Sequence, residues 1–276
     1  MNKLVYSFLL ALSLCACNTK KGETNSNFED SDSDSVVNFK DSIAGIIEEQ
    51  TVPKSADELF DDFIYGFMSS KKMQRQRIAF PLEVDEYGKT KTIEESEWKI
   101  DRLYKNQEFY TVLYDKVNDC SVEKDTSIYH AVVEWIYLNE NRVKKYDFNR
   151  GKNGEWKLTK IIYERMSKNV NTDFLSFYQK FATDSAFMRA HLETPLEFIS
   201  VDEETGEDIK GTLTADQWFD LQPEMPNGRI SNVIYGQQYK NPNQKILFMR
   251  GLANGMMLSF KFKKVGGDWK LVSFVN

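Results

Sequence analysis

The stretches FDDFIYGF (residues 60–67) and FLSFYQKF (residues 174–181) carry the same apolar pattern 114 residues apart. In both, large apolar side chains recur at positions i, i+3, i+4 and i+7, the spacing that places them on one face of an α-helix. Three of those four positions are phenylalanine in each stretch. We therefore predict two equivalent amphipathic helices, each beginning one copy of a duplicated unit.

The correspondence extends over nearly the whole chain beyond residue 55. Pro81-Leu82-Glu83 is identical to Pro195-Leu196-Glu197, again 114 residues away. Further matched pairs, some displaced by insertions, are Met73 with Phe187, Ile78 with Leu192, Trp98 with Trp218, Tyr114 with Tyr235, Phe148 with Phe262 and Trp156 with Trp269. A period this long indicates duplicated domains, because the repeats of solenoid proteins span only about 20–50 residues.

Helices are predicted at the start of both copies. A shorter helix follows the first one, through residues 73–78 and 187–192, and the Pro-Leu-Glu element then leads into a short strand and a polar loop. In a capping box, two side chains satisfy free backbone N–H groups at a helix start. Its spacing occurs at Ser55/Glu58, Thr92/Glu95 and Thr214/Gln217. The last two boxes predict a third short helix in each copy.

Strand patterns fill the rest of each copy. Runs rich in β-branched and aromatic residues predict four strands over residues 109–114, 128–138, 143–148 and 156–163, and four more over residues 230–235, 246–252, 256–263 and 269–275. We expect the α+β fold class, with two tandem cone-shaped domains over residues 54–168 and 169–276. Each would pack N-terminal helices on a curved antiparallel sheet.

The chain begins with a predicted lipoprotein signal peptide, residues 1–17. Its apolar run, residues 4–16, is too short to cross a hydrocarbon core of about 30 Å. The run ends in Leu14-Cys15-Ala16-Cys17, which resembles the bacterial lipobox, with an aliphatic residue at −3, a small residue at −1 and a lipidated cysteine. We predict lipidation of Cys17; the alternative is an ordinary cleaved signal that leaves Cys17 as an incidental thiol.

An acidic flexible tether is predicted over residues 18–53. It has low hydrophobicity and eight acids against three bases. This composition is typical of segments that bury too little apolar surface to offset the entropy lost on ordering. The tether holds −5 of the formal net charge of −6, and no basic stripe is present to neutralise phosphates. Nucleic acid is therefore excluded as a partner. Since Asn18 is not the aspartate typical of inner-membrane retention, we expect a lipid anchor in the outer membrane on the periplasmic side, with surface exposure as the other option.

The order of helices and strands, ending on a Trp-Lys-Leu strand in each copy, resembles the nuclear-transport-factor-like (cystatin-like) cone fold. A lipobox followed by two such cones is similar to an uncharacterised family of bacterial lipoproteins with a domain of unknown function. The wider fold includes isomerases, dehydratases and plain binding or assembly domains. The resemblance thus implies a fold and leaves the function open.

No catalytic motif, metal or cofactor is expected. The two histidines, His130 and His191, do not stand at metal-ligand spacing. Because His191 aligns with Arg77, we expect that position to lie on an exposed helix face. Cys120 has no histidine nearby in sequence, and no phosphate loop, dinucleotide fingerprint or nucleophile elbow occurs.

Six residues form a candidate pocket. Glu83 and Glu197 each follow Pro-Leu at the inferred cone wall, where a buried carboxylate is suited to proton transfer. The competing interpretation, which we favour, pairs each glutamate with a lysine or a turn. Tyr114 and Tyr235 offer hydroxyl groups, and Trp218 and His191 complete the set, although the tryptophan is equally suited to core packing.

Two function classes follow. The favoured one is a non-catalytic binding or scaffolding protein of the cell envelope, which contacts an envelope protein through the groove between the cones or through a sheet face. The alternative is small-molecule binding, or isomerase- or hydratase-like catalysis, in the pocket of one cone. A cavity with convergent polar groups favours the alternative.

Overall fold

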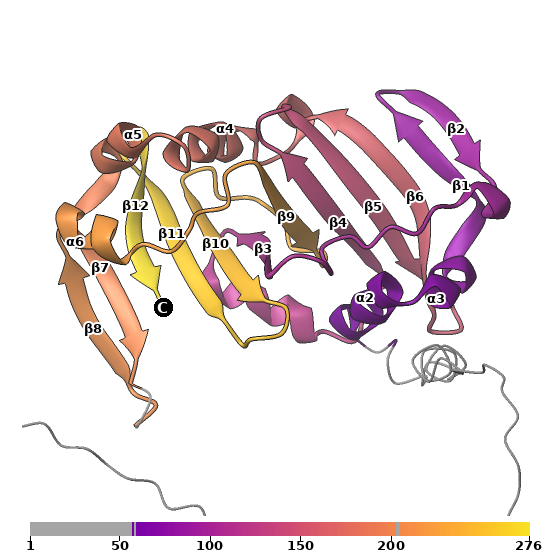
Figure 1. Cartoon of the computed structure of the whole chain (residues 1–276), viewed down its shortest axis with the longest axis horizontal. Coiled ribbons are helices and arrows are strands. Elements are labelled where there is room, and N and C mark those ends of the chain that lie inside the picture. The colour runs from indigo at the N-terminus through magenta and orange to yellow at the C-terminus, as the bar shows by residue number, and fades with distance from the viewer. Residues whose placement is uncertain (1–56, 58, 203–204) are drawn as a thin grey trace, which may run out of the picture. The chain divides into compact units, whose positions relative to one another are not determined.

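The computed structural model describes residues 57, 59–202 and 205–276 (Figure 1). All of them belong to one compact unit, Gly45–Asn276. Cys17, the signal peptide, the tether and the capping box Ser55/Glu58 lie outside the described residues and stay predictions. Below, the first half means residues 57–168 and the second half residues 169–276.

The two halves contain the same order of strands and opening helices, with 3-10 helices (η) added in the first half. The first half holds α2 (Phe60–Ser69), α3 (Lys71–Gln76), β1 (Ile78–Glu86), β2 (Lys89–Ile93), η2 (Glu95–Glu97), β3 (Phe109–Tyr114), η3 (Val117–Lys124), β4 (His130–Tyr137), β5 (Arg142–Arg150), β6 (Trp156–Arg165) and η4 (Met166–Lys168). The second half holds α4 (Thr172–Phe181), α5 (Ser185–Ala190), β7 (Leu192–Val201), β8 (Asp208–Leu213), α6 (Ala215–Leu221), β9 (Arg229–Ile234), β10 (Gln244–Gly251), β11 (Met257–Val265) and β12 (Asp268–Val275).

Three of the described α-helices start at a side chain that accepts a hydrogen bond from a backbone N–H group. Ser70 caps α3, and Asp184 caps α5 by accepting from two backbone nitrogens. The predicted capping box of Thr214 and Gln217 is confirmed at α6. The one predicted at Thr92 and Glu95 is wrong, since the glutamates at positions 94 and 97 form the box, around the single turn of η2.

The strands form two six-stranded sheets, and one strand of each half crosses into the sheet of the other. The orders are β2-β1-β6-β5-β4-β9 and β3-β10-β11-β12-β7-β8. Thus β9 lies beside β4, and β3 lies beside β10 (Figure 1). We expected the four long strands of each copy to form their own sheet. That expectation is wrong for β3 and β9, because their partners are chosen by long-range contacts.

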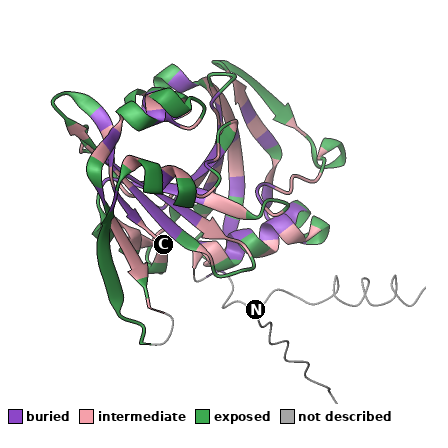
Figure 2. Ribbon diagram, turned by 60° about the vertical axis from the view of Figure 1, so that its left-hand side comes forward, coloured by how far each residue is buried: buried purple, intermediate pink, exposed green. Residues whose placement is uncertain are grey.

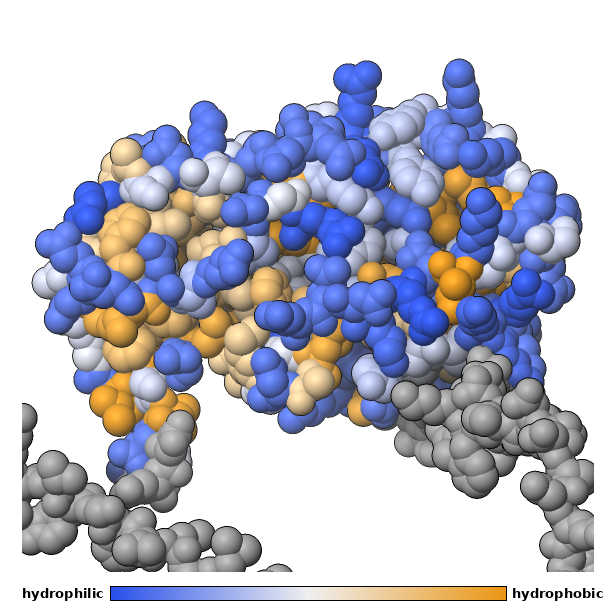
Figure 3. Space-filling view, viewed as in Figure 1, coloured by the Kyte–Doolittle hydropathy of each residue, from blue (hydrophilic) through white to orange (hydrophobic). Residues whose placement is uncertain are grey.

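Both sheets are mixed, which corrects the expectation of purely antiparallel sheets. β1 pairs in parallel with β6, and β7 with β12, while the other pairs are antiparallel. The stretches predicted as polar loops are β2 and β8, the outer strands on which most residues are exposed. These two strands do not alternate between apolar and polar residues, because neither of their faces is deeply buried. Figure 3 shows apolar surface over the β7–β8 hairpin, where Val201 and Ile209 are exposed.

Strand register corrects one matched pair of the repeat. Tyr114 pairs with Ile246 in one sheet, and Ile234 pairs with Val132 in the other. Because Val132 and Ile246 are 114 residues apart, Tyr114 is equivalent to Ile234, and the match of Tyr114 with Tyr235 is one residue out of step. A slip of one residue turns a strand side chain to the opposite face.

The apolar framework is packed twice, in two clusters of buried side chains. The rings of Phe60 and Trp156 are 5.1 Å apart at 70°, and those of Phe174 and Trp269 are 5.3 Å apart at 70°. The ring centroids of Phe67 and Phe148 are 5.3 Å apart, and those of Phe181 and Phe262 are also 5.3 Å apart. Buried residues follow the strands and the inward faces of the helices (Figure 2). The predicted equivalence of the two aromatic helices, α2 and α4, is confirmed.

Candidate functional site

Both candidate glutamates lie on the surface. The Glu83 carboxylate is 2.6 Å from the ammonium of Lys160, and its side chain is 45% exposed. Glu197 is exposed on β7. The pairing of Glu83 with a lysine is the one that we favoured from sequence. Neither carboxylate faces a core, because each lies on the solvent side of its strand.

The other four candidates divide between the two cores. Tyr114 and Tyr235 both lie in the first core. Trp218 is fully buried in the second core, where its indole N–H donates to the sulfur of Met188 at 3.3 Å. His191 ends α5 and stacks on Phe187 with ring centroids 3.8 Å apart. The six predicted residues therefore do not converge on one pocket.

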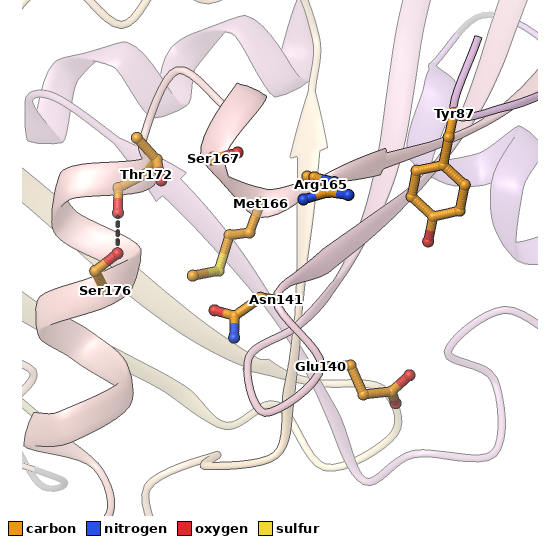
Figure 4. A pocket seen from close by; sticks show the side chains of 8 residues that line it. All are labelled: Tyr87, Glu140, Asn141, Arg165, Met166, Ser167, Thr172 and Ser176. Carbon is orange, nitrogen blue, oxygen red and sulfur yellow. Dashed lines mark hydrogen bonds between the residues drawn. The ribbon is translucent and has the colours of Figure 1, made fainter.

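A hollow of about 540 Å³ lies at the junction of the two halves (Figure 4). It is lined by Tyr87, Glu140, Asn141, Arg165, Met166, Ser167, Thr172 and Ser176. These residues come from the β1–β2 turn, the β4–β5 turn, the end of β6 with η4, and the first turns of α4. We call it the junction hollow.

Backbone and side-chain contacts shape the junction hollow. The Met166 backbone N–H donates to the Asn141 carbonyl at 2.8 Å, which ties η4 to the β4–β5 turn. Asn141 has a φ of 51°, a left-handed conformation that asparagine tolerates better than most residues. In Figure 4 the Ser176 hydroxyl donates to the Thr172 carbonyl at 2.8 Å. The lining is consequently polar, and most of it is held on turns and helix ends.

The junction hollow offers one exposed cation and one exposed aromatic ring. Arg165 is exposed at the end of β6, and Tyr87 is 55% exposed. Glu140 is already paired with Arg142, at 2.5 Å. The space thus combines a guanidinium, an aromatic ring and several hydroxyl groups, which suits a polar partner better than an apolar one.

A second polar group of side chains lies at the first core and draws on both halves, and we call it the carboxyl–tyrosine cluster. The Tyr235 hydroxyl donates to the Asp61 carboxylate at 2.6 Å. The rings of Tyr104 and Tyr110 stack 5.1 Å apart at 15°. The pKa of Asp61 is raised from the ordinary 3.8 to about 6. Burial is the main cause; the Tyr235 hydrogen bond acts to lower the pKa, and the neighbouring Glu123 acts to raise it.

Arg250 and Glu123 border this cluster. The Arg250 guanidinium donates to one carboxylate oxygen of Glu123, and the Tyr114 hydroxyl donates to the other at 2.5 Å. Burial raises the pKa of Tyr110 to about 12. Arg250 Nε is buried and has no hydrogen-bond partner within the described part of the chain. The charge of Arg250 is therefore committed mainly to Glu123.

The carboxyl–tyrosine cluster has no counterpart in the other copy. Arg250 lies opposite Tyr110 across β10 and β3, whereas the equivalent pair across β4 and β9 is Ile136 and Ile230. Asp61 stands 114 residues before Leu175. Reasoning from matched positions missed this site. The signal that would have found it is an acid in one copy where the other copy has leucine.

A hollow of about 420 Å³ is lined by residues that lie close in sequence to members of the cluster. Its lining is Tyr65, Lys105, Gln107, Glu108, Leu252, Ala253 and Asn254. Tyr65 lies one turn after Asp61 on α2, so the two side chains share a helix face. The Lys105 ammonium lies 4.9 Å from the centroid of the Tyr65 ring. The rim of this hollow therefore already accommodates a cation.

The family described as domain of unknown function DUF4348 matches residues 39–276. The chain belongs to the DUF4348 family. A crystal structure of an NTF2-like protein from Bacteroides fragilis is 37% identical to it, with a TM-score of 0.76, and the match covers 82% of this chain and 98% of that chain. This DUF4348 protein is thus a mixed α+β protein with an NTF2-like structural relative.

A second crystal structure, an NTF2-like protein of unknown function from Shewanella baltica, is 15% identical with a TM-score of 0.22. That match covers 37% of this chain and 86% of the other. No curated protein matches the DUF4348 chain.

Neither metal-ligand clusters nor long apolar helices occur in the described part of the DUF4348 chain. Over residues 57, 59–202 and 205–276, no three histidine, cysteine, aspartate or glutamate side chains are grouped so as to hold a metal ion. None of the helices in the same ranges has the length and hydropathy needed to cross a membrane. Cys120 is a free, partly buried thiol beside the first core.

Proposed function

We propose that this DUF4348 protein is a non-catalytic binding or scaffolding protein of the bacterial cell envelope that contacts its partner at the junction hollow. Acyl chains on Cys17 hold it at the outer membrane, since each buried CH₂ contributes about 0.8 kcal/mol to membrane attachment. The observation that carries the proposal is the position of the hollow. It collects exposed polar groups from both halves, next to cores in which large aromatic side chains are buried.

The proposal includes a finer account of the fold. Each half is one NTF2-like cone, residues 54–168 and 169–276, and the exchange of β3 and β9 locks the two cones together. The matching ring geometry around Trp156 and Trp269 supports this account. An interlocked pair keeps the loops around the junction hollow in fixed positions, which reduces the entropy lost when a partner binds.

Site-specific photo-crosslinking tests the contact surface in the intact, lipid-anchored protein. A photoreactive phenylalanine analogue replaces Tyr87, which is 55% exposed in the junction hollow. The matched control replaces Tyr129, which is 73% exposed. Tyr129 directly precedes the first residue of β4, at the end of the strand away from the β4–β5 turn. We expect a discrete crosslinked partner from position 87 and none from position 129.

A charge reversal sharpens the same experiment. Arg165→Glu replaces the exposed guanidinium of the hollow, and we expect it to weaken the crosslink from position 87 by about tenfold or more. Equal yields from both positions, or a crosslink that is indifferent to Arg165→Glu, would refute the contact surface. The membrane anchor does not depend on that result.

A second candidate function is supported by the carboxyl–tyrosine cluster. A carboxyl whose pKa is about 6, beside three tyrosines and a hollow of about 420 Å³, is suited to binding a small polar molecule or to isomerase- or hydratase-like proton transfer. A thermal-shift screen with envelope metabolites tests it. A ligand at 100 times its Kd stabilises by about 2.7 kcal/mol. The effect should vanish in Asp61→Asn and persist in Asp62→Asn, the exposed neighbour.

A further inference from the structure

A hollow of about 260 Å³ lies at the first residues of β3 and β9, and we call it the strand-start hollow. It shares no lining residue with the junction hollow. The side chains that give it its chemical character are Gln107, Phe109, Tyr110, Trp135 and Arg229. Its volume is just below the roughly 300–1,000 Å³ of sites for drug-sized ligands, so it suits a molecule with a single ring.

Among the described residues, Arg229 is the one charged side chain that lines this hollow. Its guanidinium carbon lies 4.2 Å from the centroid of the Trp135 ring and 5.9 Å from that of Tyr137. Arg229 is exposed, and it forms no ion pair with any acid in residues 57, 59–202 and 205–276. A guanidinium over an aromatic ring keeps its N–H donors, which lie in its own plane, for an acceptor.

Two arginines with little exposure are each paired with an acid instead. The Arg77 guanidinium donates to both carboxylate oxygens of Asp57 at 2.8 Å. Arg77 is only 9% exposed, so the sequence expectation of an exposed helix face at this position is wrong. Arg250 likewise donates to Glu123. Arg229 has aromatic rings where these two have a carboxylate, and its charge is therefore available.

The repeat gives no structural reason for a cation at position 229. Arg229 pairs with Tyr137 across β9 and β4, and Phe109 pairs with Gly251 across β3 and β10. Because Gly251 is 114 residues after Tyr137, Phe109 is the equivalent of Arg229. The fold accepts a phenylalanine at this position in the other copy. The charge of Arg229 is therefore not needed for the strand to form.

Aromatic rings form a fixed wall beside the guanidinium. Tyr110 stacks on Tyr104 with ring centroids 5.1 Å apart, and Tyr104 meets Trp135 edge to face at 6.5 Å. Tyr104 and Trp135 are buried, so packing holds their rings in place. Phe109 and Tyr110 are half-buried and line the hollow. Such rings offer a flat apolar contact surface to another ring.

Carboxylates do not compete for Arg229 in the described lining of the hollow. Glu108, which follows Gln107 in sequence, lines the neighbouring hollow of about 420 Å³. Glu140, in the turn after Tyr137, is paired with Arg142 at 2.5 Å. The strand-start hollow thus presents a positive charge next to aromatic rings, which favours an anion over a cation.

We propose that the strand-start hollow binds a small aromatic carboxylate, a single planar ring that carries a carboxylate group. The carboxylate accepts two parallel N–H hydrogen bonds from Arg229, the geometry that the guanidinium fork provides. The ring of the ligand contacts Phe109, Tyr110 and the exposed edge of Trp135. This site is independent of the partner contact at the junction hollow.

Isothermal titration of the purified full chain tests the site with matched probes. Benzoate carries the ring and the carboxylate, benzamide replaces the carboxylate with a neutral amide of nearly the same shape, and acetate lacks the ring. We expect benzoate to bind at least about tenfold more tightly than benzamide, because hydrogen bonds between charged groups are the stronger ones. We expect a margin of about tenfold over acetate, because acetate has no ring to contact the aromatic wall.

Three variants locate the binding. Arg229→Phe installs the residue of the other copy, and it should abolish the preference for benzoate over benzamide while the unfolding midpoint stays near that of the parent. Phe109→Ala keeps the guanidinium and removes one ring, so it should reduce the preference for benzoate over acetate. Arg75→Gln changes an exposed arginine on α3, and as the control for charge it should leave all three affinities unchanged.

Several results would overturn the proposal. They are equal affinity for benzoate and benzamide, equal affinity for benzoate and acetate, or no binding of any probe. Equal losses of benzoate affinity in Arg75→Gln and Arg229→Gln would overturn it as well, since net charge alone would then account for the binding. Should Arg229→Phe fail to fold, Arg229→Gln decides the question, because it keeps a polar side chain at the exposed position.

Discussion

Thr111 and Ser231 occupy equivalent positions in the two copies of the repeat, and they hydrogen-bond to each other. The Thr111 backbone N–H donates to the Ser231 hydroxyl at 2.8 Å, which in turn donates to the Thr111 carbonyl at 3.1 Å. The Thr111 hydroxyl donates to the Ser231 carbonyl at 2.5 Å. Contact between equivalent residues is the mark of a local two-fold axis. Strands β3 and β9 therefore meet at a local two-fold axis that relates the two halves.

Thr111→Val should destabilise the protein by about 1–3 kcal/mol, because it removes the hydroxyl that donates to the buried Ser231 carbonyl while keeping the side-chain shape. The control is Thr90→Val on the exposed edge strand β2, for which we expect a change within about 0.5 kcal/mol. Urea denaturation measures both. Similar effects of the two substitutions would argue against the contact as a stabilising feature.

Phe60→Ala and Phe174→Ala should each cost about 3–5 kcal/mol, because the two rings are buried in equivalent aromatic surroundings. The exchange of β3 and β9 makes each sheet depend on both halves. We therefore expect a single unfolding transition, shifted by either substitution. Tryptophan fluorescence and far-ultraviolet circular dichroism should report the same midpoint. Two separate transitions, only one of which moves, would show that the halves unfold independently.

The pKa of Asp61 predicts a pH dependence of stability. A folded-state pKa of about 6, above the ordinary 3.8, means that the fold favours the protonated carboxyl. Its stabilising contribution is full below pH 3.8 and is lost as the pH rises through 6, which amounts to about 3 kcal/mol for a shift of roughly two pH units. The free energy of unfolding of Asp61→Asn should therefore rise relative to that of the parent as the pH increases from 4 to 7. Asp62→Asn retains Asp61 and should follow the parent's pH dependence. Parallel curves of stability against pH for Asp61→Asn and the parent would contradict the raised pKa of Asp61.

Cys17→Ala should release the protein from membranes, because no acyl chain can then be attached. Fractionation of cells without detergent measures the soluble share, and Cys120→Ala is the matched control that keeps the anchor. A Cys17→Ala variant that stays in the membrane fraction would contradict lipidation as the means of attachment.

Local pattern was enough to predict the secondary structure and part of the site. Apolar spacing predicted α2 and α4, and β-branched runs predicted the last four strands of each half, since both signals depend on neighbours within a few residues. The edge strands β2 and β8 escaped because their residues are mostly exposed. Tyr114 and Tyr235 were predicted as hydroxyl donors, but their acceptors, Glu123 and Asp61, were not. Tyr235 and Asp61 are 174 residues apart, and no local pattern connects them.

The sequence by itself determined that one unit occurs twice and which residues form its helices and strands, because amphipathic periodicity is a property of short segments. Only the tertiary structure decided that β3 and β9 change sheets, that Tyr235 faces Asp61, and that Arg229 lies over Trp135. Those outcomes depend on packing between distant segments. There a register shift of one residue, or one phenylalanine replaced by arginine, changes which side chains meet.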